Sequence, residues 1–166
     1  MAKPKLALYW AASCGGCEIA VLDTCRELGV TFVAFSPVAR GFLCGELRDV
    51  GTLVANDIRR HMPRFAPETY AANLPLLDGF LALAREVGCT PAQLALAWLL
   101  HKDETLIPIP GTSQIAHLQD NFRADQVQLD PAQMQRLEAL INPRTVHGAR
   151  YNAQNAVEVD TEEFQA

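Results

Sequence analysis

The stretch that decides the fold is TPAQLALAWLLHKDETLIPIP, which spans Thr90–Pro110. Its opening Thr-Pro-Ala-Gln is spaced as a capping box with a proline in the first turn, so a helix is predicted to begin there. Leu94–Leu100 is apolar nearly all round, which is typical of a buried helix. Thr105–Pro110 then has the length and apolar content of a short strand. A buried helix that leads into a strand is half of a parallel α/β unit.

The same order precedes this stretch. Glu18–Leu28 is predicted to be a helix, and Gly29 lies where a terminating glycine belongs. Val30–Phe35 is β-branched and aromatic, which predicts a strand buried on both faces. Lys5–Trp10 is a further short apolar run of strand type. Strands that alternate with helices predict a parallel sheet and an α/β fold.

The remaining segments complete this outline. Ser36–Ala66 is long and irregular, and loops of this length are usually functional or disordered. Asn73–Val87 is predicted to be helical, as is a segment near Gln114–Phe122. A last helix is predicted from Asp130 as N-cap through Ile141, with Pro131 in its first turn.

Composition narrows the class of protein. The chain has 166 residues, 49% of them hydrophobic, which suits about one globular domain. The net charge of −5 and the scattered Lys and Arg argue against a nucleic-acid partner. No apolar run is long enough to span a bilayer, so no membrane partner is expected. The five cysteines are too few for a disulfide scaffold, and we expect reduced thiols and a cytoplasmic location.

In parallel α/β folds, binding sites lie at the carboxyl ends of the strands. Gly111, Thr112 and Ser113 link a predicted strand to a predicted helix, where free backbone N–H groups and hydroxyls can bind a phosphate. The alternative, which the local chemistry favours, is that Ser113 merely caps that helix. In the loop after Phe35, Arg40 beside Gly41 can reach a phosphate. The alternative is an ordinary turn whose Arg side chain is solvated.

Cys14 and Cys17 form a Cys-x-x-Cys pair. Such a pair can hold one edge of a metal site or an iron–sulfur cluster, or can cycle as a dithiol for electron transfer. A full site needs about four ligands, and no second Cys-x-x-Cys is present. Two reduced thiols in a loop are the simpler alternative.

From about Glu18 to Tyr151, the chain resembles the C-terminal part of an aldo/keto reductase. The resemblance rests on several motifs in the family's order: residues 18–29 (EIAVLDTCRELG), 30–45 (VTFVAFSPVARGFLCG), 63–65 (PRF), 90–100 (TPAQLALAWLL), 107–121 (IPIPGTSQIAHLQDN) and 148–151 (GARY). It implies a partial (β/α)8 TIM barrel that contains the C-terminal βα units only. It further implies an NADP(H) cofactor and the reduction of aldehydes and ketones.

By position, the resemblance implies a cofactor-binding role for two loops. Their residues are Ser36, Val38, Arg40 and Gly41 near the pyrophosphate, Gly111, Thr112, Ser113 and Gln114 at the 2′-phosphate, His117 where many members carry an Arg, and Asp120 and Asn121 at the adenine. His117 is a weaker, pH-dependent cation, which leaves the choice between NADP and NAD open.

The family's catalytic Asp, Tyr, Lys and His all come from the first half of the barrel, upstream of anything matched here. No residue of this chain inherits those roles, so the resemblance implies a truncated or fused chain. A small carbonyl substrate is then expected to bind only when another chain completes the barrel. An open set of about three strands also leaves edges unpaired, which predicts a fragment that needs a partner or self-associates.

The N-terminus resembles a different family. Lys3–Asp23 is similar to the start of the small subunit of an [NiFe] hydrogenase, or of the related quinone-reductase subunit, where the two cysteines would hold an iron–sulfur cluster. We therefore expect three segments: residues 1–17 as this N-terminal piece, residues 18–151 as the reductase-like region, and residues 152–166 as a polar tail.

Overall fold

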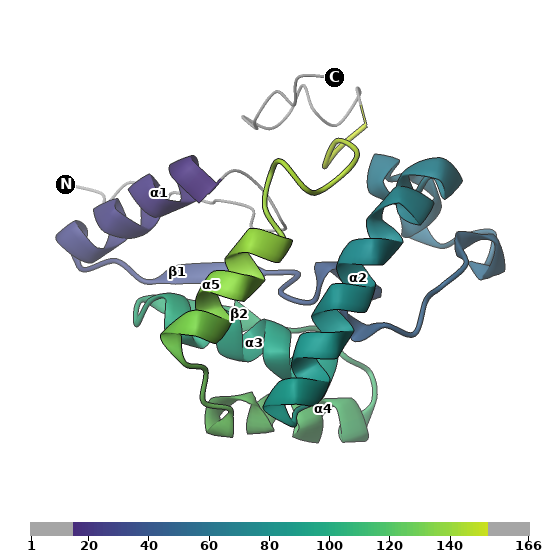
Figure 1. The fold of residues 1–166 in the computed structure, drawn as a ribbon. Coiled ribbons are helices and arrows are strands. Elements are labelled where there is room, and N and C mark those ends of the chain that lie inside the picture. Colours follow the sequence, from purple (N-terminus) through teal and green to yellow (C-terminus); the bar gives the residue numbers. More distant parts are fainter. Residues whose placement is uncertain (1–14, 153–166) are drawn as a thin grey trace.

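The structure is a computed structural model that describes residues 15–152. The predicted strand Lys5–Trp10 lies outside the described residues. The helices are α1 (Gly15–Leu28), α2 (Pro67–Val87), α3 (Pro91–Lys102), α4 (Ile115–Phe122) and α5 (Pro131–Leu140). The strands are β1 (Phe32–Phe35) and β2 (Leu106–Ile109), which are adjacent and parallel (Figure 1).

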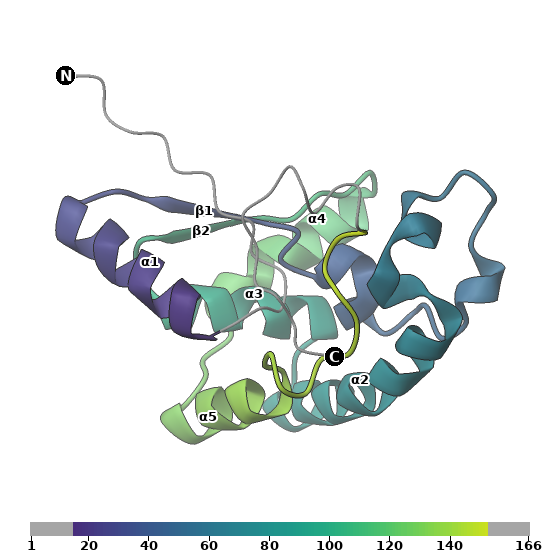
Figure 2. The ribbon, with the colours of Figure 1, turned by 90° about the horizontal axis from the view of Figure 1, so that it is seen from above.

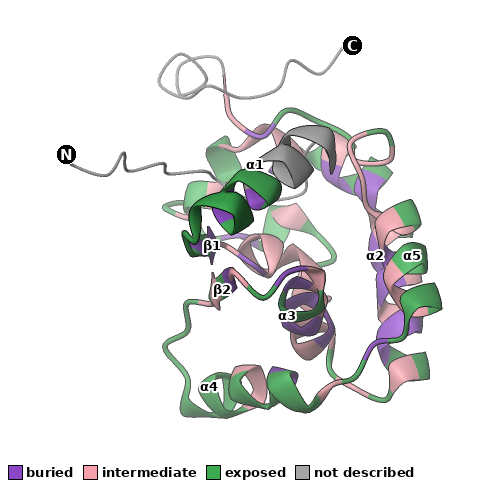
Figure 3. Ribbon diagram, turned by 90° about the vertical axis from the view of Figure 1, so that its left-hand side faces the viewer, coloured by how far each residue is buried: buried purple, intermediate pink, exposed green. Residues whose placement is uncertain are grey.

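The elements form layers. α3 lies between the two strands on one side and the pair α2 and α5 on the other (Figures 2 and 3). One apolar cluster joins α3 to the strands and α1, through residues such as Leu99, Phe32 and Leu22. A second cluster joins the other side of α3 to α2 and α5. Helix α3 is therefore the central element of the described chain.

The predicted start and burial of α3 are confirmed. The Thr90 hydroxyl accepts the Gln93 backbone N–H, and the Gln93 side chain accepts the Thr90 N–H, which completes the predicted capping box. Leu94 and Ala97 are fully buried, whereas Leu100 at the end of the run is 39% exposed. Burying a leucine side chain contributes about 1.5–3 kcal/mol, so this helix is a main source of stability.

The prediction that β1 is buried on both faces is wrong for the described residues. Phe32 and Ala34 are buried under α1 and α3, but Val33 between them is 50% exposed. Its neighbours in β2, Ile107 and Ile109, are also about half exposed. The reason is that the helices cover one face of the strands, and residues 15–152 supply no layer for the other.

One helix boundary and one loop also differ from the prediction. Helix α2 begins at Pro67, six residues before the expected Asn73, and it carries Pro75 inside it. The segment expected to be irregular contains four short 3₁₀ helices, η1 (Ala39–Cys44), η2 (Val50–Thr52), η3 (Ile58–His61) and η4 (Pro63–Phe65). Helix α5 carries a capping box that begins at the predicted N-cap Asp130.

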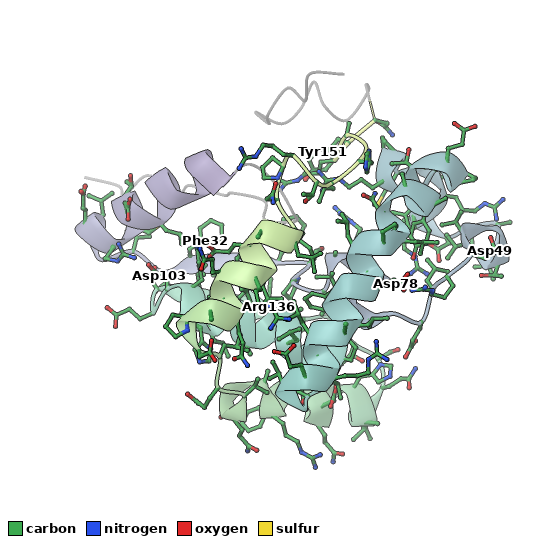
Figure 4. The ribbon with its side chains drawn as sticks, viewed as in Figure 1. Phe32, Asp49, Asp78, Asp103, Arg136 and Tyr151 are labelled. Atoms are coloured by element: carbon green, nitrogen blue, oxygen red, sulfur yellow. The ribbon has the colours of Figure 1, made fainter. Side chains whose placement is uncertain are left out.

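An ion pair joins α1 to the turn between α3 and β2. The Arg26 guanidinium donates to the carboxylate of Asp103, which is 6% exposed. That carboxylate also accepts the Thr105 backbone N–H at 2.8 Å, and this bond is the main reason that the pKa of Asp103 lies below its usual value. Figure 4 places Asp103 beside Phe32, at the amino end of the strands.

Within residues 15–152, no helix combines the length and hydropathy needed to cross a membrane.

Candidate functional site

The strand register brings the two predicted cofactor loops to one edge of the sheet. The first loop is Ser36–Gly41 and the second is Gly111–Asn121. Phe35 lies opposite Ile109, so Ser36 and Pro110 leave the parallel strands side by side. Burial raises the pKa of the Cys44 thiol in η1, and the negative charges of Glu46 and Asp120 raise it further. The strand register thus brings segments about 75 residues apart in the chain to one sheet edge.

The first loop is backbone-strained. Ser36, Ala39 and Arg40 have φ values of +51°, +51° and +57°, in the left-handed region that disfavours residues with a Cβ. Gly41 follows with φ +89°. Each such non-glycine residue costs of order 1–3 kcal/mol, and strained residues of this kind gather at functional sites. Turn hydrogen bonds hold the conformation, including Ala39 N–H to the Ser36 carbonyl at 2.9 Å.

A charged clamp from η3 fixes this loop. The Arg59 guanidinium donates to both carboxylate oxygens of Asp57, at 3.0 and 2.7 Å, and its Nη1 donates to the Arg40 carbonyl at 3.2 Å. Because Arg59 donates to it, the pKa of Asp57 falls to about 2. The clamp leaves the Arg40 side chain available, since no carboxylate among residues 15–152 pairs with its guanidinium.

The second loop is open to solvent. Residues Gly111 to His117 are all exposed. The expectation that Ser113 caps the following helix is wrong, because the N-cap is Gln114 and no side chain caps α4. Instead, the Thr112 hydroxyl accepts the Gln114 backbone N–H at 3.1 Å. The first N–H groups of α4 have no intrahelical acceptor, as in any helix, and here they face solvent.

Asp120 has a structural contact of its own. Its carboxylate accepts the Thr90 hydroxyl at 2.7 Å and the Gln93 amide at 2.8 Å, so it ties α4 to the start of α3. Asn121, the next residue, is half-buried. The role of both residues at an adenine stays a prediction.

A cavity of about 260 Å³ adjoins the first loop. It lies between the C-terminal half of α3, α2, α5 and the segment that follows α5. Ser36 and Arg40 line it together with five aromatic side chains and three further cationic ones: Phe42, Phe65, Tyr70, Phe80 and Trp98, and Arg64, Lys102 and Arg150. Sequence reasoning missed this cavity, because its lining comes from six separate segments that carry no common motif.

The cysteine pair stays a prediction. Cys14 lies outside the described residues, and of Cys17 only the backbone, in α1, is described. Among the side chains that the structure describes, no group of three or more His, Cys, Asp or Glu residues is placed to hold a metal ion.

The comparisons with known proteins agree with the motifs. A family profile described as "Aldo/keto reductase family" matches residues 18–142. The chain belongs to the aldo/keto reductase family. A curated relative from Schizosaccharomyces pombe, "Aldo-keto reductase yakc [NADP(+)]", is 37% identical over 134 residues, which cover 81% of this chain and 39% of the relative. This aldo/keto reductase chain therefore spans about two fifths of that relative's length.

The chain is also similar to two solved structures, of which the first supports the fold. A glycerol dehydrogenase from Gluconobacter oxydans matches with a TM-score of 0.66 and 22% identity, over 78% of this chain and 39% of that one. A thermostable aldo-keto reductase matches with a TM-score of 0.48 and 27% identity, over 73% of this chain and 33% of that one. The predicted fold class is confirmed: the chain is α/β and forms part of a (β/α)8 barrel.

Proposed function

We propose that this chain is the cofactor-binding portion of an NADP(H)-dependent oxidoreductase that interconverts carbonyls and alcohols. The observation that carries the proposal is the register of β1 against β2, which joins the Ser36–Gly41 loop and the Gly111–Asn121 loop at one sheet edge. The name of the curated relative, which specifies NADP(+), supports the choice of cofactor.

The residues present fit the phosphates of a dinucleotide. On the first loop, the Arg40 guanidinium has no described carboxylate partner and is suited to a pyrophosphate. On the second, the uncapped start of α4 offers backbone N–H groups, and Thr112 and Ser113 add hydroxyls for the 2′-phosphate. His117 lies exposed in the first turn of α4, beside this helix start. The bound cofactor would supply the hydride chemistry.

We further propose that residues 18–151 do not supply the catalytic half of the barrel. The proton donor that the family's reaction requires must be within reach of the carbonyl, and the residues for that role have no counterpart in this segment. This chain alone is then expected to bind dinucleotide and to reduce no carbonyl. We retain residues 18–151 as the reductase unit and residues 1–17 as a separate segment similar to a hydrogenase small subunit.

We also propose a cytoplasmic location. The described cysteines Cys25, Cys44 and Cys89 are free thiols, which suits a reducing compartment.

A titration with NADPH tests the proposal. Binding is followed by Trp fluorescence and calorimetry, with NADH as the comparison. Arg40→Gln should weaken NADPH by about tenfold or more, because a charge-assisted hydrogen bond contributes about 1.5–3 kcal/mol. Arg144→Gln, an exposed arginine after α5, is the matched control and should leave the affinity unchanged. Folded protein that does not bind NADPH would refute the proposal.

A further inference from the structure

The ion pair of Asp57 and Arg59 supports the first loop from outside it. Arg59 lies in η3, and all three nitrogens of its guanidinium donate: Nε and Nη2 to the Asp57 carboxylate, and Nη1 to the Arg40 carbonyl. The pair is partly shielded from water, since the Arg59 and Asp57 side chains are 26% and 16% exposed. Because two bonds to one carboxylate fix the plane of a guanidinium, the third donor meets the Arg40 carbonyl in a set direction.

A cluster of aromatic rings supports the chain just after this loop. The Arg59 guanidinium lies 5.9 Å from the centre of the Phe65 ring, and the Phe65 and Tyr70 ring centres are 5.6 Å apart. Tyr70 in turn meets the Phe42 ring at nearly a right angle, with ring centres 5.5 Å apart. Phe65 and Tyr70 are both buried. Arg59 and the rings beside it therefore hold the chain at two positions, Arg40 and Phe42.

The conformation of the first loop requires such support. Ser36, Ala39 and Arg40 have positive φ values, which residues with a Cβ adopt only at a cost. Backbone strain of this kind persists where the surrounding structure holds it in place. Arg59, 19 residues further along the chain, supplies such a contact at the last of the three strained residues.

We propose that Arg59 is a positioning residue for the dinucleotide, because it holds the first loop in the conformation that receives the pyrophosphate. This inference rests on the proposed function and adds to it a residue that lies outside both cofactor loops. Arg59 acts through the backbone of Arg40, whose own guanidinium contacts the phosphate in the proposed function. Lysine cannot replace Arg59, since a single ammonium lacks the flat fork that serves several acceptors at fixed angles.

Two ligands separate this role from a general effect on stability. In the proposed function, NADPH uses the first loop for its pyrophosphate and the second for its 2′-phosphate, whereas adenosine 2′-phosphate uses the second loop alone. We expect Arg59→Gln to weaken NADPH about tenfold, since affinity falls with the share of molecules whose loop keeps the binding conformation. The affinity for adenosine 2′-phosphate should stay unchanged. Both affinities are measured by calorimetry on the full chain, and Arg59→Lys should resemble Arg59→Gln.

The neighbouring arginine provides the matched control. Arg60 also lies in η3, and its Nη1 donates to the Leu53 carbonyl at 2.6 Å. Arg60→Gln therefore removes a comparable hydrogen bond from the same short helix at a carbonyl outside the first loop, and it should leave both affinities unchanged. Circular dichroism confirms that each variant is folded. If Arg59→Gln does not fold, Arg59→Lys provides the same comparison.

The outcomes distinguish this inference from the function on which it rests. If the unchanged protein does not bind NADPH, the proposed function fails and this inference fails with it. If the unchanged protein binds NADPH and a folded Arg59 variant binds it equally tightly, the inference alone is overturned. An equal loss of affinity for the two ligands, or a loss in Arg60→Gln as large as that in Arg59→Gln, would also overturn it.

Discussion

Replacing Ala39 by glycine should stabilise the protein, which is the reverse of the usual effect of that substitution. Ala39 has φ +51°, a conformation that costs a residue with a Cβ about 1–2 kcal/mol. Glycine removes that cost but loses about 0.5–1 kcal/mol of extra backbone freedom on folding. The net expectation is a gain of about 0.5–1 kcal/mol in the free energy of unfolding, measured by urea denaturation at 25 °C.

The same substitution elsewhere provides the control. Ala82 is exposed in the interior of α2, where Ala82→Gly should cost about 1 kcal/mol because glycine is a poor helix former. The two variants should therefore differ in sign. If Ala39→Gly destabilises the chain as much as Ala82→Gly does, the strain assigned to the first loop is refuted.

Other features give further expectations. Asp57→Asn should lower the free energy of unfolding at pH 7. Because the pKa of Asp57 is depressed from 3.8 to about 2, the difference in stability between the variant and the unchanged protein should shrink as the pH falls through that window. Urea unfolding at stepped pH measures this difference. Thr90→Ala should cost about 1 kcal/mol through the lost helix cap, and an unchanged midpoint would contradict the cap. Anaerobic iron and sulfide should give a colourless product, because Cys14 and Cys17 supply two of about four ligands; a brown product with bound iron would favour the electron-transfer alternative. The isolated chain should self-associate in sizing chromatography and Ile107→Thr should reduce this, whereas a compact, cooperatively melting monomer would contradict it.

Local signals in the sequence predict local structure well. The capping boxes at Thr90 and Asp130 fix helix starts because their hydrogen bonds join residues three positions apart. Gly29 ends α1 with φ +61°, as its position predicts. By contrast, the Ser113 prediction fails because α4 begins at Ile115, so that Gln114 and not Ser113 is the N-cap residue. The sequence alone does not fix this boundary, because no capping box marks it.

Features that depend on distant segments could not be read from the sequence. The clamp from Arg59 to the Arg40 carbonyl joins residues 19 positions apart, and the cavity lining comes from α2, α3, α5 and the loops around them. The burial of β1 was mispredicted for the same reason. An apolar run such as Val30–Phe35 indicates that both faces of a strand favour apolar neighbours. It does not indicate which layer of the fold supplies those neighbours.

Contacts within residues 15–152 shape the proposed cofactor loops: Arg59 holds the first loop, and Asp120 ties α4 to α3. The exposed face of Val33 and Ile107, in contrast, lacks a covering layer among those residues. The contacts of the proposed dinucleotide site thus do not depend on that covering layer. For this reason we expect the titration proposed above to show dinucleotide binding without carbonyl reduction.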